Sequence, residues 1–311
     1  MRAVQLKTPV RPKKLVQGDT VGVVAPAGPV NPQELERGLA IIRGMGFKVL
    51  LGEHLKDRQG YLAGSDADRA EDVMGMFENP EVKAIFCARG GYGVNRILPL
   101  LDSRTIQRNP KIVVGSSDIT LFLLYLVQKC SLVAFHGPMV AGSFGCHPMK
   151  ASKAQFRKIL TGQKVRLSVP QARELKPGKA QGPLTGGCLT LLCRSLKTPY
   201  EVQTQGRVVL IEDVNEAPYR IDGMLWQLKK AGKFKGVKGV VFGEMINCHP
   251  PKGESGKIDD VILDVLQDEK FPILMNCPIG HGNEMWTLPL GINATLDTRT
   301  RSLVFKKSGV R

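Results

Sequence analysis

The chain has 311 residues, of which 42% are hydrophobic and 23% charged, and its formal net charge is +16. This composition is typical of a globular protein with one large domain or two of moderate size, and no apolar stretch reaches the roughly 18–20 residues of a membrane helix. The basic N-terminus has no apolar signal core, and the seven cysteines include no CxxC pair. We therefore expect a cytoplasmic protein without a disulfide framework or a zinc site.

The first half of the sequence alternates apolar, β-branched runs with segments of helical periodicity. Asn31 and Pro32 stand where an N-cap and a first helical residue are expected. Strands that recur with helices between them predict a parallel sheet, with function at the carboxyl ends of its strands. The predicted strands lie within 20–28, 47–52, 82–91, 111–118 and 132–138, and the predicted helices within 31–46, 65–80 and 148–163.

The second half of the sequence begins after a change in residue composition. Residues 161–182 are predicted to connect two domains, because the stretch around them is rich in Pro, Gly and Lys. An N-terminal α/β domain over 1–160 and a smaller C-terminal α/β domain over 183–311 are therefore expected. The second domain should contain strands at 207–213 and 237–244, helices at 189–196, 218–232 and 258–269, and a β-hairpin at 287–305.

The positive charge is dispersed rather than concentrated. Short basic clusters lie at 11–14, 229–238 and 306–307, with no aromatic interleaving and no zinc-finger or RNP signature. These features argue against a nucleic-acid partner. Small acidic substrates, or solubility alone, account for the charge equally well.

Two serines and an aspartate occupy a turn where a strand gives way to an apolar helical run. A serine nucleophile needs a rigid turn, a base held by an acid, and backbone N–H groups that meet the developing oxyanion. In "VGSSDIT", Gly115 permits a tight turn, and the helix that follows directs its free N–H groups at it. The pattern is GxSD and not GxSxG, and taken alone Ser117 or Asp118 is more often a helix cap.

The glycine-rich segment "CARGGYGVNR" (87–96) leaves several interpretations open. It could cradle a phosphate, although it has neither Walker nor GxGxxG spacing. It could instead supply an oxyanion N–H to the neighbouring serine turn. The third interpretation is a turn that needs a positive φ at Gly90 or Gly91.

Acids and histidines of the second half are candidates for the rest of a triad. A carboxylate at the end of strand 207–213 could orient a histidine, although capping and ion pairing are the commoner roles. The candidate acids are Glu212, Asp213, Glu216 and Asp222, and the candidate bases are His54, His136, His147, His249 and His281. His281 lies between glycines in a loop, and His136 is its main rival. No histidine pair has HExxH spacing, so neither a metal nor another cofactor is expected.

These segments, in this order, resemble the LD-carboxypeptidase family, the serine peptidases of murein recycling and their microcin C-resistance relatives. The resemblance covers nearly the whole chain. It rests on "TVGVVAPAG", "ARGGYGVNRILPLLD", "VGSSDIT", "HGPM", "GPLTGGCLTLL", "LIEDVNEAPYRIDGML" and "GHGNEMWTLPLG". Any one of these motifs is modest, whereas the ordered set is specific.

The resemblance implies roles for individual residues. The family's serine precedes the aspartate of GxSD, its glutamate is the first acid of the "IED" element, and its histidine precedes the TLP segment. This implies a triad of Ser117, Glu212 and His281, assembled across the interface of two domains, without a metal. The N–H groups of Asp118 and Gly91 would form the oxyanion hole.

The resemblance also implies a function. The expected reaction removes the terminal D-alanine from a murein tetrapeptide, in muropeptide recycling by a homodimer, and an acidic peptide suits a basic protein. A second hypothesis is the same chemistry on an acyl-sulfamoyl or acyl-phosphoramidate nucleotide of the microcin type. A third is a basic module that binds nucleotide or nucleic acid without hydrolysis, which salt-dependent DNA binding would support.

Two positions depart from the family pattern. Cys188 stands where the family's asparagine is expected, which leaves details of the substrate pocket open. Ser116 is small where aromatic residues or histidine are familiar.

Overall fold

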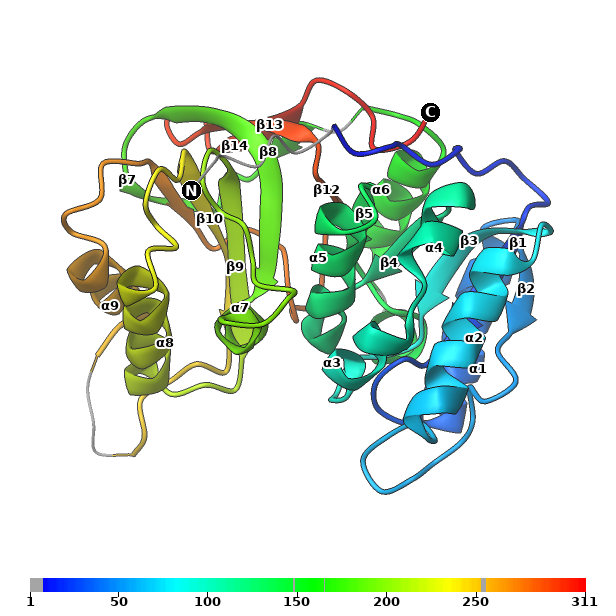
Figure 1. Ribbon diagram of the computed structural model, residues 1–311. Helices are drawn as coiled ribbons and strands as arrows, with labels where there is room; N and C mark the ends of the chain where they lie inside the picture. Colours follow the sequence, from blue (N-terminus) through cyan, green and yellow to red (C-terminus); the bar gives the residue numbers. More distant parts are fainter. Residues whose placement is uncertain (1–7, 148, 165, 253–255) are drawn as a thin grey trace.

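The computed structural model describes residues 8–147, 149–164, 166–252 and 256–311. Two β-sheets with their helices lie beside each other (Figure 1). Strands and helices alternate along the first sheet, and helices α7 (Leu189–Ser195), α8 (Pro218–Lys230) and α9 (Ile258–Val265) accompany the second. The predicted α/β class is confirmed.

The first sheet has the strand order β12-β5-β4-β3-β1-β2, in which β1 to β5 run parallel and β12 antiparallel. Its strands are β1 (Thr20–Val24), β2 (Lys48–Leu51), β3 (Val82–Cys87), β4 (Ile112–Gly115), β5 (Ala134–His136) and β12 (Leu288–Leu290). Its helices are α1 (Pro32–Gly44), α2 (Asp66–Glu78), α3 (Val94–Ile97), α4 (Ser103–Arg108), α5 (Thr120–Gln128) and α6 (Lys150–Leu160). Single turns of other helix types are η1 (Leu98–Leu100), η2 (Ser117–Ile119) and η3 (Val140–Phe144).

Local sequence explains where the first helices begin. The side chain of Asn31 accepts hydrogen bonds from the N–H groups of Gln33 and Glu34, and Pro32 occupies the first turn of α1. Ser65 and Asp68 form a reciprocal capping box at the start of α2. The predicted N-cap of α1 is therefore confirmed.

The second sheet is mixed, with the order β6-β14-β13-β8-β9-β10-β11-β7 and parallel pairing from β8 to β11. Its strands are β6 (Arg166–Ser168), β7 (Arg173–Lys176), β8 (Lys179–Cys188), β9 (Val208–Val214), β10 (Gly239–Ile246), β11 (Ile273–Met275), β13 (Asn293–Asp297) and β14 (Ser302–Phe305). Its helices are α7 (Leu189–Ser195), α8 (Pro218–Lys230) and α9 (Ile258–Val265).

The segment expected to connect the domains contains regular structure. Within 161–182 lie β6, β7 and the beginning of β8. Strands β6 and β7 form the two edges of the second sheet. An edge strand pairs on one side only and commonly carries charged residues, so its composition resembles that of a linker.

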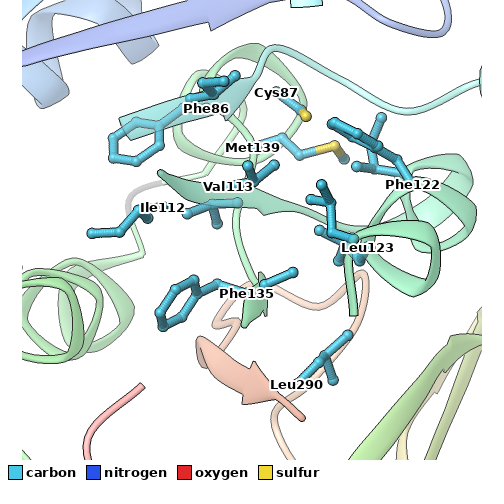
Figure 2. Close-up of a cluster of buried hydrophobic side chains, with 14 of the residues drawn as sticks. Phe86, Cys87, Ile112, Val113, Phe122, Leu123, Phe135, Met139 and Leu290 are labelled. Atoms are coloured by element: carbon cyan, nitrogen blue, oxygen red, sulfur yellow. The ribbon is translucent and has the colours of Figure 1, made fainter. Parts of the chain in front are cut away.

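The prediction of a C-terminal β-hairpin over 287–305 is correct only in part. Strands β13 and β14 pair antiparallel as predicted, but β12 pairs with β5 in the first sheet. Figure 2 shows Leu290 of β12 in the same apolar cluster as Val113 of β4 and Phe135 of β5, and all three side chains are buried. The chain therefore returns to the core of the first sheet before it completes the second.

Within the residues that the structure describes, no helix combines the length and apolarity that crossing a bilayer requires.

Candidate active site

The residues singled out from the sequence lie at the carboxyl ends of parallel strands in both sheets. Ser117 follows β4, the glycine loop follows β3, and Glu212 lies near the end of β9. His281 lies in the loop 276–287, which joins β11 to β12. This is the edge of an α/β sheet at which ligands usually bind.

Ser117 has the backbone conformation of a strained strand-to-helix turn. Its φ is +59°, in the left-handed region that non-glycine residues rarely occupy. Ser116 is extended and only 2% exposed, and Asp118 is 1% exposed, whereas Ser117 is partly accessible. Of the three polar residues, Ser117 is the one that can reach a substrate.

Asp118 positions the glycine loop. Its carboxylate accepts a hydrogen bond from the N–H of Val94 at 2.9 Å, and burial raises the pKa of this carboxyl to about 6. The buried guanidinium of Arg69 holds the same loop from the other side, donating to the carbonyl of Gly93 at 3.0 Å. The side chain of Asp118 thus has a structural partner, and its N–H lies at the start of the helical turn beside Ser117.

Gly90 lies against the serine turn. A Cβ on Gly90 would come within 2.8 Å of Ser117 Cβ and 3.0 Å of its Oγ. Gly91 follows with a φ of +112° and packs against Gly28. The close backbone approach explains the glycine at position 90, and the N–H of Gly91 as an oxyanion donor stays a prediction.

Glu212 and His281 come together although 69 residues separate them. Nδ1 of His281 lies 2.8 Å from Oε2 of Glu212, which is fully buried, and the histidine side chain is 21% exposed. Burial alone would lower the pKa of His281, but the charge of Glu212, its hydrogen bond to the ring and the charge of Asp213 together outweigh burial and raise this pKa. Burial likewise opposes ionisation of Glu212, yet the neighbouring histidines lower its pKa. Because a carboxylate can only accept, Nδ1 donates to Glu212 and Nε2 is left as the basic nitrogen.

His136 faces the other oxygen of the same carboxylate. Its Nε2 lies 3.5 Å from Oε1 of Glu212, and its ring is completely buried. His136 is also the sheet neighbour of Gly115, two residues before Ser117. His281 is the better candidate for the base because it is partly accessible and makes the shorter contact.

A second chain of contacts links the serine turn to the acid. The hydroxyl of Thr120 accepts a hydrogen bond from the N–H of Cys188 at 3.2 Å. Cys188 pairs in turn with Glu212 across β8 and β9. Ser117 and Glu212, from different sheets, are therefore joined through two neighbouring residues.

Three of the other candidate acids and bases make contacts outside the proposed triad. Asp213 accepts hydrogen bonds from both the N–H and the hydroxyl of Thr190, at the start of α7. Glu216 lies 3.5 Å from Arg220. His54 contacts Asp57 at 2.9 Å, and with Asp68 these side chains could hold a metal ion, although the group includes no residue of the proposed triad or oxyanion hole.

The sequence reasoning missed Glu244. It lies on β10, and one of its carboxylate oxygens is buried without a hydrogen-bond partner among the described residues. Burial raises the pKa of this carboxyl. A side chain on Gly282, next to His281, would overlap this carboxylate. The rule that function collects at strand ends could have identified it, because Glu244 ends the predicted strand 237–244.

A groove of about 580 Å³ opens beside the glycine loop. Gly91 lies on its wall with Arg58 and Arg89, whose side chains are exposed. The rings of Tyr61 and Tyr92 meet edge to face there, with centroids 5.7 Å apart. The groove thus offers two cations and two aromatic surfaces beside the glycine loop, whose Gly90 lies against Ser117.

Comparison with known proteins identifies the family. The N-terminal domain of the LD-carboxypeptidases matches residues 21–137, and their C-terminal domain matches residues 181–296. The chain is 39% identical over 302 residues to a probable murein peptide carboxypeptidase of Bacillus subtilis (strain 168), covering 95% of this chain and 94% of the relative. It is 31% identical over 288 residues to the murein tetrapeptide carboxypeptidase of Pseudomonas aeruginosa, covering 89% and 92%.

A solved structure shares the two-domain fold. The microcin C7 self-immunity protein MccF, in complex with aspartyl sulfamoyl adenosine, superposes with a TM-score of 0.92 at 25% identity, covering 97% of this chain and 100% of that chain. The chain belongs to the LD-carboxypeptidase family, as the sequence motifs indicated. These likenesses support a peptidase of the carboxypeptidase type.

Proposed function

We propose that this protein is a serine-type LD-carboxypeptidase that removes the terminal D-alanine from a murein tetrapeptide. The contact between His281 and the buried Glu212, at the strand edge that also carries Ser117, is the observation that supports it most strongly. The murein carboxypeptidases among its relatives point to the same substrate class.

In the proposed mechanism, Ser117 Oγ attacks the carbonyl carbon of the amide before D-alanine, and its proton passes to Nε2 of His281. Glu212 holds the imidazole in the tautomer that leaves Nε2 free and stabilises the cation that forms. Collapse of the tetrahedral intermediate breaks the C–N bond, and His281 protonates the leaving amine. Water then hydrolyses the acyl-enzyme, with His281 again acting as the base.

The developing oxyanion would accept hydrogen bonds from the N–H groups of Asp118 and Gly91. One such donor contributes about 3 kcal/mol to lowering a barrier of this kind. The positive φ of Ser117 supports its role as the nucleophile, because a strained strand-to-helix turn is the geometry that exposes the serine hydroxyl in other hydrolases.

The substrate would extend along the groove beside the glycine loop. Arg58 and Arg89 can pair with carboxylates of an acidic murein peptide.

We further propose that the triad is assembled between an N-terminal domain over 1–160 and a C-terminal domain over 183–311. A cytoplasmic homodimer acting in peptidoglycan recycling completes the proposal.

A second candidate function is hydrolysis of a microcin-type acyl nucleotide. The fold shared with MccF, whose complex contains aspartyl sulfamoyl adenosine, favours it. Tyr61 and Tyr92 on the groove wall could stack a base. Parallel assays with murein tetrapeptide and aspartyl sulfamoyl adenosine, read by mass spectrometry, distinguish the two functions.

The central experiment compares Ser117→Ala with Ser116→Ala. Both changes remove one hydroxyl from the same turn, but only Ser117 is accessible. D-alanine release from murein tetrapeptide should disappear in Ser117→Ala and persist in Ser116→Ala. Retained activity in Ser117→Ala would disprove the assignment of the nucleophile.

A further inference from the structure

A second cavity, lined by none of the triad residues, lies beside β8, near the amino end of β9 on one side and the start of β13 on the other. It has a volume of about 280 Å³, and we call it the Arg207 pocket after the residue just before β9. Glu212 follows Arg207 by five positions of extended chain, which corresponds to roughly 16 Å. The Arg207 pocket is therefore separate from the proposed active site, and its interpretation does not depend on that function.

Three cations line this pocket. Arg207 is only 7% exposed, whereas Lys306 and Lys307, which directly follow β14, are exposed. The residues that line the pocket include no aspartate or glutamate. The positive charge is therefore not neutralised from within the pocket wall.

Arg207 has no partner for its guanidinium among the described residues. No hydrogen bond or ion pair of its side chain is found there, and burial alone lowers its pKa, with no carboxylate acting in the opposite direction. A guanidinium stays protonated even when buried, so this largely buried side chain keeps its positive charge. Such a charge is costly unless an anion or a hydrogen-bond acceptor pairs with it.

The pocket also offers neutral donors and a suitable size. Gln181 and Asn293, which carry side-chain amides, are among the residues that line it. Its volume equals that of about nine water molecules at roughly 30 Å³ each, which admits a compact anion and excludes a folded polymer. Pro9 and Val127 contribute from the first-sheet side, so an occupant would contact both halves of the protein.

We propose that the Arg207 pocket binds a phosphate group, as inorganic phosphate or as a small phosphomonoester. The planar fork of Arg207 can donate two parallel hydrogen bonds to two phosphate oxygens, and the two lysines supply the charge that a dianion requires. The amides of Gln181 and Asn293 can donate to the remaining oxygens.

Calorimetric titration of the full chain tests this proposal. Inorganic phosphate and glycerol phosphate are titrated separately at pH 7.5, each against sodium chloride at the same ionic strength. Tighter binding of inorganic phosphate identifies the free ion, and tighter binding of glycerol phosphate identifies a phosphomonoester. Heats no larger than those of chloride for both probes would overturn the proposal.

Variants locate the binding. Arg207→Met keeps a long apolar stem and should weaken phosphate affinity at least tenfold, and Lys306→Gln/Lys307→Gln should weaken it severalfold. Arg43→Gln/Lys48→Gln, an equal loss of charge on α1 and β2, should leave it unchanged. Equal weakening by both double variants would show a general charge effect and refute the pocket. If Arg207→Met does not fold, the two double variants still decide the question.

Discussion

Replacing Glu212 by glutamine tests the proposed triad most directly. Glutamine preserves the volume of the side chain and an acceptor for Nδ1 of His281, but removes the charge. Glu212 is fully buried, and its contacts to His281 at 2.8 Å and His136 at 3.5 Å hold it on both sides. The variant should therefore fold with the same geometry.

The size of the effect follows from the distance between the charges. When His281 takes the proton of Ser117, a cation and the Glu212 carboxylate are separated by about 4 Å between charge centres. At an effective dielectric constant of 20 this attraction is about 4 kcal/mol. Without this attraction, kcat/KM should fall roughly 10³-fold. If glutamine also favours the incorrect histidine tautomer, kcat/KM should fall about 10⁴-fold.

The pH profile gives a second readout. Glu212 raises the pKa of His281 against the effect of burial. The base acts in its neutral form, so the acidic limb of kcat/KM follows this pKa. Without the carboxylate, burial lowers the pKa, and the limb should move to lower pH while the maximal rate falls.

The assay is D-alanine release from murein tetrapeptide between pH 4 and 9. Glu216→Gln is the matched control, since this acid lies four residues further on and pairs with Arg220. It should keep the rate within a factor of about three and leave the limb in place. Activity within tenfold of wild type in Glu212→Gln, or a limb that moves to higher pH, would refute the role of Glu212.

Three further changes test neighbouring residues. Gly90→Ala places a Cβ 2.8 Å from Ser117 Cβ, so kcat should fall roughly 100-fold without unfolding, and wild-type kinetics would contradict this. Arg89→Gln should raise KM roughly tenfold at constant kcat in steady-state assays. Asp118→Asn keeps an acceptor for Val94 but removes a carboxyl whose pKa burial raises from 3.8 to about 6. Ionisation of Asp118 as the pH rises from 4 to 6 therefore destabilises the wild-type fold. In urea titrations the free energy of unfolding of Asp118→Asn should exceed that of the wild type by up to about 3 kcal/mol at pH 8, and by little below pH 4.

Local patterns predicted the regular part of the fold well. The cap at Asn31 and the parallel strands of the first sheet were predictable because they depend on residue types that are adjacent in the sequence. The edge strands β6 and β7 were not predicted, because one-sided pairing tolerates the charged, proline-containing composition of a loop. Strand β12 was assigned to the hairpin because alternation cannot say which sheet a strand joins.

The serine turn shows what residue patterns leave undecided. Ser116, Ser117 and Asp118 were equivalent as local signals, and only the family resemblance selected Ser117. The difference between them arises from tertiary structure. Gly90 lies so near residue 117 that a Cβ on it would come within 2.8 Å of the Ser117 side chain, and the neighbours of Ser117 on either side are buried.

The placement of His281 depends on contacts that no local pattern contains. Its loop is attached to α6, because Glu284 accepts a hydrogen bond from the N–H of Ser152 at 2.8 Å near the start of that helix. Strand β12 then continues from this loop into the first sheet. The base is thus carried by the second half of the chain but held in position by the first. Changes at Ser152, remote in sequence from every proposed catalytic residue, should therefore act on the orientation of His281.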